Sequence, residues 1–136
     1  MIFITGGAHQ GKLDYAKKNY KLSDSDIADC ADMDTDKLDT DKLYEKRCIT
    51  NLQLIARDSK SQTPEALEDF VSALISREQT TGIEYILIMD NVGSGIVPIK
   101  KEDRDYREAA GRLGCLIAES SRTVIRVICG IGQQIK

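Results

Sequence analysis

The chain has 136 residues, of which 41% are hydrophobic and 30% charged, and its formal net charge is −3. This composition predicts one globular domain over residues 1–136. The acidic balance argues against nucleic acid or an anionic membrane surface as a partner, because both reward clustered lysine and arginine. No apolar stretch has the length of a signal peptide core or a membrane span, so we expect a cytoplasmic protein.

The first predicted element is a buried strand over residues 1–5 that runs into a glycine-rich loop. The loop matches the phosphate-binding pattern G-x-x-x-x-G-K-[ST], except that Leu13 replaces the final hydroxyl residue, and residues 12–19 can form the helix that follows. We expect its backbone N–H groups and Lys12 to hold phosphates. An ordinary glycine turn is the alternative. The predicted nucleotide-binding residues are Gly6, Gly7, Ala8, His9, Gln10, Gly11, Lys12 and Leu13.

The middle of the chain carries weaker signals. Residues 26–30 are a short candidate for a second strand. The tandem repeat DTDKL-DTDKL at 34–43 lacks the glycine and the closing glutamate of an EF-hand, so it reads as an acidic surface segment or the start of a helix, with Leu38 and Leu43 facing inward. Residues 41–57 keep helical spacing at four apolar positions, namely Leu43, Cys48, Leu52 and Ile55.

The C-terminal half alternates clearer helices and strands. A helix starts at Thr63-Pro64-Glu65, with a capping residue followed by a first-turn proline. Its predicted buried stripe is Ala66, Leu67, Phe70, Leu74 and Ile75. We expect strands at 84–90 and 123–129 and a helix between them at 102–120. This order predicts an α/β fold with a mostly parallel sheet flanked by helices, whose chemistry lies at the carboxyl ends of the strands.

Asp90 ends the most apolar of these strands. A carboxylate in this position is the arrangement that holds magnesium beside a phosphate loop, directly or through water, so Asp90 is the predicted metal ligand and, with Lys12, the predicted catalytic pair. A capping aspartate at the end of the strand is the alternative. The implied cofactor is Mg²⁺ with ATP or GTP.

The segment after Asp90 is rich in glycine, which suggests backbone brought close to a ligand. We expect Asn91, Gly93 and Gly95 on the substrate side of the site, with Arg107 and Arg112 from the next helix as further candidates. Either arginine can reach a phosphate, and an ion pair at the surface is the equal alternative for each. The four cysteines, with no C-x-x-C pair, are expected to be reduced, semi-buried apolar residues.

These motifs together resemble the bifunctional adenosylcobinamide kinase/adenosylcobinamide-phosphate guanylyltransferase family. Its pattern has a GGxxxGKS loop, N-E-x-G-x-G-[IV]-V-P, F-R-D-x-x-G-R and a final S-G-[IL]-x-x-x-I-K. The corresponding strings here are the loop at 6–13, DNVGSGIVP at 90–98, YREAAGR at 106–112 and CGIGQQIK at 129–136. The resemblance is strong over the first twenty and last fifty residues and weak between them.

The resemblance implies a RecA-like P-loop NTPase fold, assembly as a trimer, and phosphorylation of the aminopropanol hydroxyl of adenosylcobinamide by ATP or GTP. It also implies transfer of GMP from GTP through a guanylylated histidine. This chain departs from the family there, because it is shorter and its single histidine, His9, lies inside the phosphate loop. Leu13 and the pair Asp90-Asn91, where the family has Asn-Glu, also depart from the pattern.

The sequence therefore favours an adenosylcobinamide-kinase-like phosphotransferase that lacks guanylyl transfer. In it, a water replaces the missing loop hydroxyl on the metal. Two alternatives stay open. One is a catalytically silent nucleotide-binding partner or regulatory protein, and the other is a related kinase acting on a different alcohol.

Overall fold

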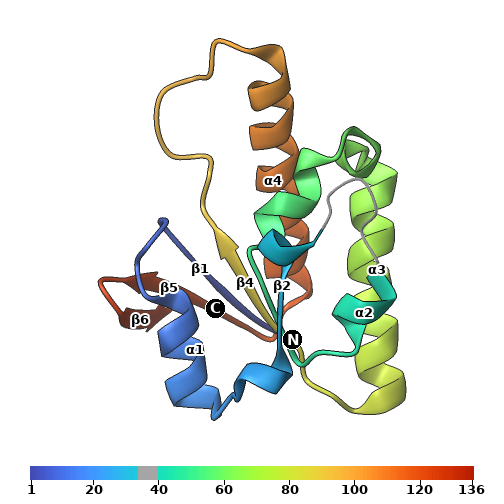
Figure 1. The fold of residues 1–136 in the computed structure, drawn as a ribbon, viewed down its shortest axis with the longest axis vertical. Coiled ribbons are helices and arrows are strands. Elements are labelled where there is room, and N and C mark those ends of the chain that lie inside the picture. Colours follow the sequence, from blue (N-terminus) through green and yellow to red (C-terminus); the bar gives the residue numbers. More distant parts are fainter. Residues whose placement is uncertain (34–39) are drawn as a thin grey trace.

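The computed structural model describes residues 1–33 and 40–136, and within them the chain folds around one six-stranded sheet (Figure 1). The strand order is β2-β3-β4-β1-β5-β6, and all neighbours are parallel except β5 and β6. The strands are β1 (Ile2–Gly6), β2 (Ile27–Asp29), β3 (Cys48–Thr50), β4 (Ile86–Asp90), β5 (Thr123–Ile128) and β6 (Ile131–Gln134). The α-helices are α1 (Lys12–Tyr20), α2 (Thr40–Tyr44), α3 (Pro64–Thr81) and α4 (Lys101–Ser120).

The central strand β1 lies between β4 and β5, so the glycine loop that follows it emerges from the middle of the sheet. The register pairs Gly6 with Asp90, which places the start of the loop beside the end of β4. The predicted α/β fold with a mostly parallel sheet is confirmed, and so is the close approach of these two strand ends.

Helices cover both faces of the sheet, because the central strands are apolar on both sides. In β4, Ile86 and Ile88 pack into the cluster beneath α1, whereas Leu87 and Met89 pack into the larger cluster beneath α3 and α4. Figure 1 shows α1 on one side of the sheet and α3 with α4 on the other. The glycine loop at residues 6–13 thus follows a strand that is buried on both faces.

The prediction of helical structure through residues 41–57 is wrong in its centre. Helix α2 ends at Tyr44, strand β3 occupies Cys48–Thr50, and a 3₁₀ helix follows at Leu52–Arg57. All three residues of β3 are buried between β2 and β4. A strand this short does not disturb a 3.6-residue apolar period, which is why the pattern concealed it. In the acidic repeat, Leu43 is buried, whereas Leu38 lies outside the described residues.

The two long helices begin where the sequence predicts, within one residue. The Thr63 hydroxyl accepts a hydrogen bond from Ala66 N at 3.2 Å, with Pro64 in the first turn of α3. Its buried residues are Leu67, Phe70, Val71 and Leu74, so Val71 joins the predicted stripe while Ala66 and Ile75 are only partly buried. None of the helices in the described ranges is long and apolar enough to cross a membrane.

Beyond β5 the chain makes a hairpin that the sequence did not predict. Strand β6 pairs with β5 in antiparallel fashion, and Cys129 and Gly130 form the turn with positive φ angles of 50° and 77°. The turn lies against the phosphate loop, since Gly130 N donates to Gln10 O at 2.8 Å. The C-terminal segment therefore supports the loop rather than trailing away from the domain.

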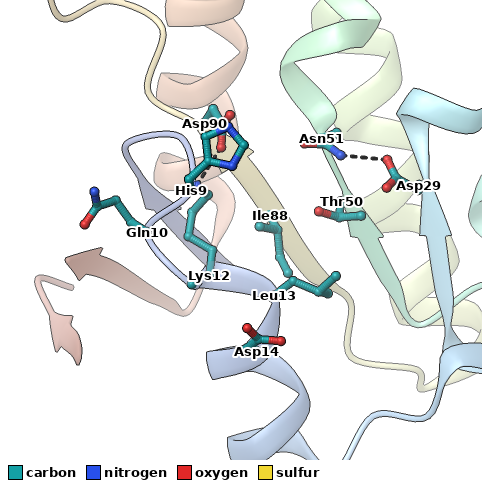
Figure 2. A pocket seen from close by; sticks show the side chains of 11 residues that line it. His9, Gln10, Lys12, Leu13, Asp14, Asp29, Thr50, Asn51, Ile88 and Asp90 are labelled. Atoms are coloured by element: carbon teal, nitrogen blue, oxygen red, sulfur yellow. Dashed lines mark hydrogen bonds and ion pairs between the residues drawn. The ribbon is translucent and has the colours of Figure 1, made fainter. Parts of the chain in front are cut away.

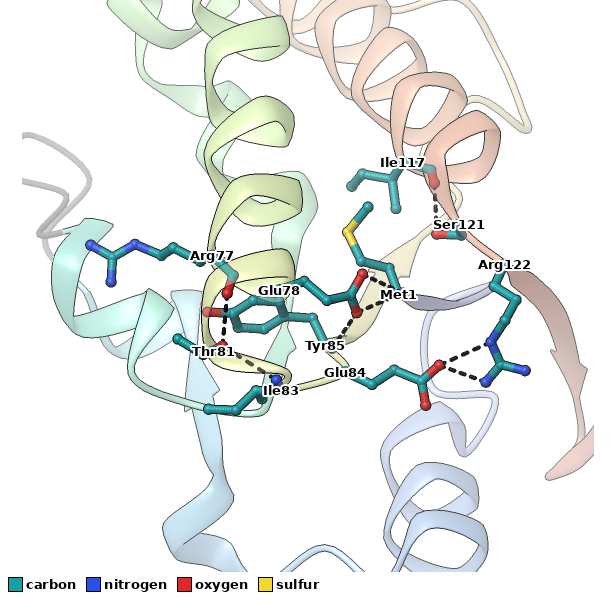
Figure 3. A network of polar contacts seen from close by, with 10 residues as sticks. All are labelled: Met1, Arg77, Glu78, Thr81, Ile83, Glu84, Tyr85, Ile117, Ser121 and Arg122. Carbon is teal, nitrogen blue, oxygen red and sulfur yellow. Dashed lines mark hydrogen bonds and ion pairs between the residues drawn. The ribbon is translucent and has the colours of Figure 1, made fainter.

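The amino ends of the strands are fixed by a separate polar network (Figure 3). The Met1 amino group contacts both carboxylate oxygens of Glu78 at 2.7 and 2.8 Å, and Tyr85 N donates to the same carboxylate at 3.1 Å. Arg122 forms an ion pair with Glu84 at 2.5 Å. The Glu78 contacts join α3 to the starts of β1 and β4, and the Arg122–Glu84 pair joins the starts of β5 and β4, all at the end of the sheet opposite the glycine loop.

All four cysteines are free thiols, and they fall into two groups. Cys30 and Cys48 are buried, and burial raises the pKa of each thiol to about 12. Cys115 and Cys129 are exposed. Cys30 and Cys48 are therefore more deeply buried than the expected semi-buried residues, and the expectation is wrong for Cys115 and Cys129, which are exposed.

Candidate functional site

A cavity of about 280 Å³ opens at the carboxyl ends of β2, β3 and β4, beside the phosphate loop (Figure 2). Residues 9–14, from the loop and the first turn of α1, form one wall. The opposite wall comes from Asp29, Thr50 and Asn51, and Ile88 and Asp90 contribute from β4 between them. The cavity thus lies at the carboxyl ends of the strands, where a parallel sheet with helices on both faces ordinarily binds its ligand.

The loop is shaped by left-handed backbone and held by the β5–β6 turn. His9 has φ 58° and Gly11 has φ 80°, so the backbone curls before α1 begins at Lys12. The Gln10 side-chain oxygen accepts a hydrogen bond from Cys129 N at 2.7 Å. Gln10 is therefore partly committed to anchoring the loop, although it also borders the cavity.

Lys12 and Asp90 form a direct ion pair, with Lys12 Nζ 2.5 Å from Asp90 Oδ1. The same ammonium donates to Gly7 O at 2.6 Å. The Lys12 side chain is only 7% exposed and that of Asp90 is 23% exposed, so the pair lies at the inner end of the cavity. The sequence predicts that these two residues lie close together. It did not predict a direct ion pair between the lysine ammonium and this carboxylate.

Leu13 takes the place of a hydroxyl residue and gives the cavity an apolar surface. It is partly buried and lines the cavity together with Ile88. The residues that the structure describes contain no group of three or more His, Cys, Asp or Glu side chains able to hold a metal. A Mg²⁺ ion is compatible with a single carboxylate, because it usually keeps several waters and binds substrate phosphates. Asp90 fits that requirement.

The wall opposite the loop was missed by sequence reasoning. Asp29 Oδ1 accepts hydrogen bonds from Asn51 Nδ2 at 2.7 Å and from Ala31 N at 2.8 Å. Gln53 connects this wall to the ion pair, since Gln53 Oε1 accepts from Asp90 N at 3.0 Å and Gln53 Nε2 donates to Asn51 Oδ1 at 3.4 Å. The signal that can find such residues is a polar side chain at the carboxyl end of a strand or directly after it, and the sequence marks β2 and β3 too weakly for this signal to be applied.

The predicted substrate-side residues lie elsewhere. Asn91 and Gly93 border a second cavity of about 190 Å³ between β4 and α4. The Arg107 guanidinium donates to the carbonyl oxygens of Gly93, Gly95 and Ile96, so it holds the loop that contains them.

Arg112 forms a surface ion pair, which is the alternative to phosphate binding that the sequence left open. It pairs with Glu108 at 3.0 Å along the exposed side of α4. Besides Asp90, none of the residues from 90 onward lines the cavity beside the phosphate loop. That residues 91–95 and the two arginines contact substrate stays a prediction.

A glycine loop between a central parallel strand and a helix, with a lysine beside the carboxylate that ends the neighbouring strand, defines an α/β fold of the P-loop NTPase type. Residues 35–135 match the family described as cobinamide kinase / cobinamide phosphate guanyltransferase, CobU, and the chain belongs to this family. The match begins after the phosphate loop.

Two curated relatives carry the name bifunctional adenosylcobalamin biosynthesis protein CobU. The chain is 35% identical to the protein of Salmonella typhimurium over 71 residues and 33% identical to that of Escherichia coli over 72 residues. These alignments cover 52% and 53% of this chain. They span only 39% and 40% of the relatives, so the chain matches about two fifths of the length of each.

Proposed function

We propose that this protein is a nucleoside-triphosphate-dependent kinase of cobalamin biosynthesis that phosphorylates a hydroxyl group of adenosylcobinamide. The observation that carries the proposal is the Lys12–Asp90 pair at the inner end of a cavity bordered by a phosphate loop. Membership of the cobinamide kinase family supports the choice of substrate. Assembly as a trimer, which the resemblance implies, stays a prediction.

In this proposal the loop N–H groups and Lys12 hold the β- and γ-phosphates of ATP or GTP. Lys12 exchanges Asp90 and the Gly7 carbonyl for phosphate oxygens when the nucleotide arrives. The released Asp90 would hold Mg²⁺, which supplies neutralisation of the charge on the transferred phosphoryl group. His9 lines the cavity and is exposed.

The test is incubation with γ-labelled ATP or GTP in the presence and absence of adenosylcobinamide. Label transferred to the cobinamide supports the proposal. Nucleotide binding without transfer or hydrolysis favours the second candidate, a catalytically silent nucleotide-binding protein. Two observations favour that candidate: Leu13 is apolar, and the Lys12 ammonium is ion-paired with Asp90. Transfer to a different alcohol, found by thermal-shift screening, would identify a related kinase instead.

Asp90→Asn should raise the affinity for triphosphate several-fold in EDTA. The substitution removes the carboxylate charge that competes with phosphate for Lys12, and it retains the side-chain shape. The hydrogen bond from Gln53 is made to the backbone of residue 90 and persists. The same variant should lose Mg²⁺-dependent turnover. Equilibrium binding of a fluorescent nucleotide with and without Mg²⁺ measures both effects, and an unchanged affinity in EDTA would contradict the competition.

Leu13→Ser should leave nucleotide binding similar while increasing Mg²⁺-dependent turnover. The new hydroxyl provides the oxygen that a phosphate loop usually gives to the ion, whereas the loop N–H groups and Lys12 are untouched. Steady-state kinetics over a Mg²⁺ titration measure the change. Turnover that stays at the wild-type level while Mg²⁺ is bound would show that the missing hydroxyl is not what limits the reaction.

The protein should form no covalent GMP adduct with GTP and Mg²⁺. Such an adduct needs a nucleophilic imidazole that approaches the α-phosphate from outside the loop, and the only histidine, His9, lies within the loop itself. Intact-protein mass spectrometry after incubation with GTP is the measurement. A GMP-sized mass increase that disappears in His9→Ala would overturn the view that guanylyl transfer is lost.

A further inference from the structure

We infer that the wall formed by Asp29, Thr50 and Asn51 is the subsite for the acceptor, and that it takes the hydroxyl group of an uncharged aliphatic alcohol. This inference rests on the proposed kinase function, because it assigns the half of the same cavity that faces the phosphate loop. It also places the acceptor at the ends of β2 and β3, away from the glycine-rich segment that follows Asp90.

The first observation is the Thr50 hydroxyl. Thr50 is only 5% exposed, and its side chain makes no hydrogen bond with any residue that the structure describes. Its oxygen retains contact with the cavity, since no fully buried polar atom of the described residues lacks a partner. Figure 2 shows this oxygen pointing from β3 toward Ile88 and the loop. A hydroxyl of a buried residue that faces a cavity without a protein partner is a group that a ligand can satisfy.

The second observation is the fixed orientation of Asp29. One carboxylate oxygen, Oδ1, receives both the Asn51 amide and the Ala31 N–H, which settles the rotation of the side chain. The other oxygen has no hydrogen bond from the described residues. A carboxylate oxygen accepts hydrogen bonds and repels phosphate, so this wall suits a donor such as an alcohol O–H rather than a second phosphate.

The third observation is the surface between the two walls. Leu13 and Ile88 border the cavity between the loop and Thr50, so an acceptor that reaches Asp29 passes apolar side chains. That surface favours carbon atoms next to the hydroxyl over a second polar group. Leu13, the residue that departs from the phosphate-loop pattern, then contributes to contact with the acceptor.

The test uses Asp29→Asn and Thr50→Val in the full chain, with Asp32→Asn and Thr50→Ser as controls. Asparagine keeps an oxygen for the Ala31 and Asn51 hydrogen bonds and removes the free acceptor oxygen, so the fold should persist. Asp32 is an exposed carboxylate that does not border the cavity. Each test variant should raise KM for adenosylcobinamide about tenfold or more, as the loss of one hydrogen bond to a charged or buried partner predicts. The nucleotide dissociation constant should change by less than about twofold, and Thr50→Ser should retain wild-type KM.

A second measurement separates this inference from the proposed function. NMR titration of the wild type with 2-propanol, without nucleotide, should shift the backbone amide signals of positions 50 and 51, and the corresponding signals should not shift in Thr50→Val. That result supports the subsite even if adenosylcobinamide is not phosphorylated. Unchanged KM in both test variants, or 2-propanol shifts that are absent from this wall, would overturn the subsite while leaving nucleotide binding at the loop intact.

Discussion

Lys12→Ala is expected to weaken binding of ATP and GTP about a hundredfold, or roughly 2.7 kcal/mol. The cavity would lose the ammonium at its inner end and the charge-assisted hydrogen bonds that it offers to phosphate. The loop N–H groups and the start of α1 remain, so residual binding should persist. Isothermal titration calorimetry with a non-hydrolysable triphosphate, in excess Mg²⁺, measures the loss.

Lys18→Ala is the matched control, because Lys18 is an exposed lysine on the same helix. It should bind nucleotide as the wild type does. The unfolding free energy of Lys12→Ala should change little, since the carboxylate left behind is 23% exposed and can be hydrated. Equal nucleotide affinities in the two variants would show that Lys12 does not contact phosphate, and would remove the observation that carries the kinase proposal.

The position of Lys12 beside Asp90 was predictable because both residues carry local signals. A glycine loop between an apolar strand and a helix is recognisable within a dozen residues, and Asp90 directly follows a run of four buried residues. That these two strands are neighbours follows from the usual arrangement of such folds. The direct ion pair was not predictable in this way, since it depends on the conformations of two side chains that no local sequence pattern reports.

The opposite wall was not predictable by the same means. Strands β2 and β3 have three residues each, too few for an apolar period to develop, and β3 was hidden inside a helical pattern. Asp29 and Asn51 meet only because β2 and β3 pair in parallel, with Asp29 opposite Thr50. Their hydrogen bond joins residues 22 positions apart, and no local pattern in the sequence reports it.

The role of Arg107 is set by backbone carbonyl groups that require hydrogen-bond donors. The sequence left two partners open for Arg107, a phosphate group and a surface carboxylate. In the structure its guanidinium serves three carbonyl groups of the segment after Asp90, which has no secondary structure of its own to satisfy them. An arginine with five donors suits such a loop, and a sequence pattern does not show which carbonyls will turn toward it.

Gly6→Ala is expected to lower the unfolding free energy by about 3 kcal/mol, because the new methyl group has no room. A Cβ at this position would lie 2.3 Å from the carbonyl oxygen of Val127, which is backbone of the neighbouring strand β5. That carbonyl cannot move without separating β1 from β5. A loss of this size corresponds to a melting temperature lower by roughly 10 °C for a domain of this length.

Gly7→Ala tests whether the effect belongs to that one approach or to glycine in general. At Gly7 the nearest atom to an added Cβ is the Gln10 Cγ at 3.4 Å, an ordinary contact with a side chain. This variant should unfold within a few degrees of the wild type when both are followed by circular dichroism. If Gly6→Ala proved as stable as Gly7→Ala, the strands would be looser there than the register implies. The phosphate loop would then begin from a flexible point, and the fixed placement of Lys12 beside Asp90 would need another cause.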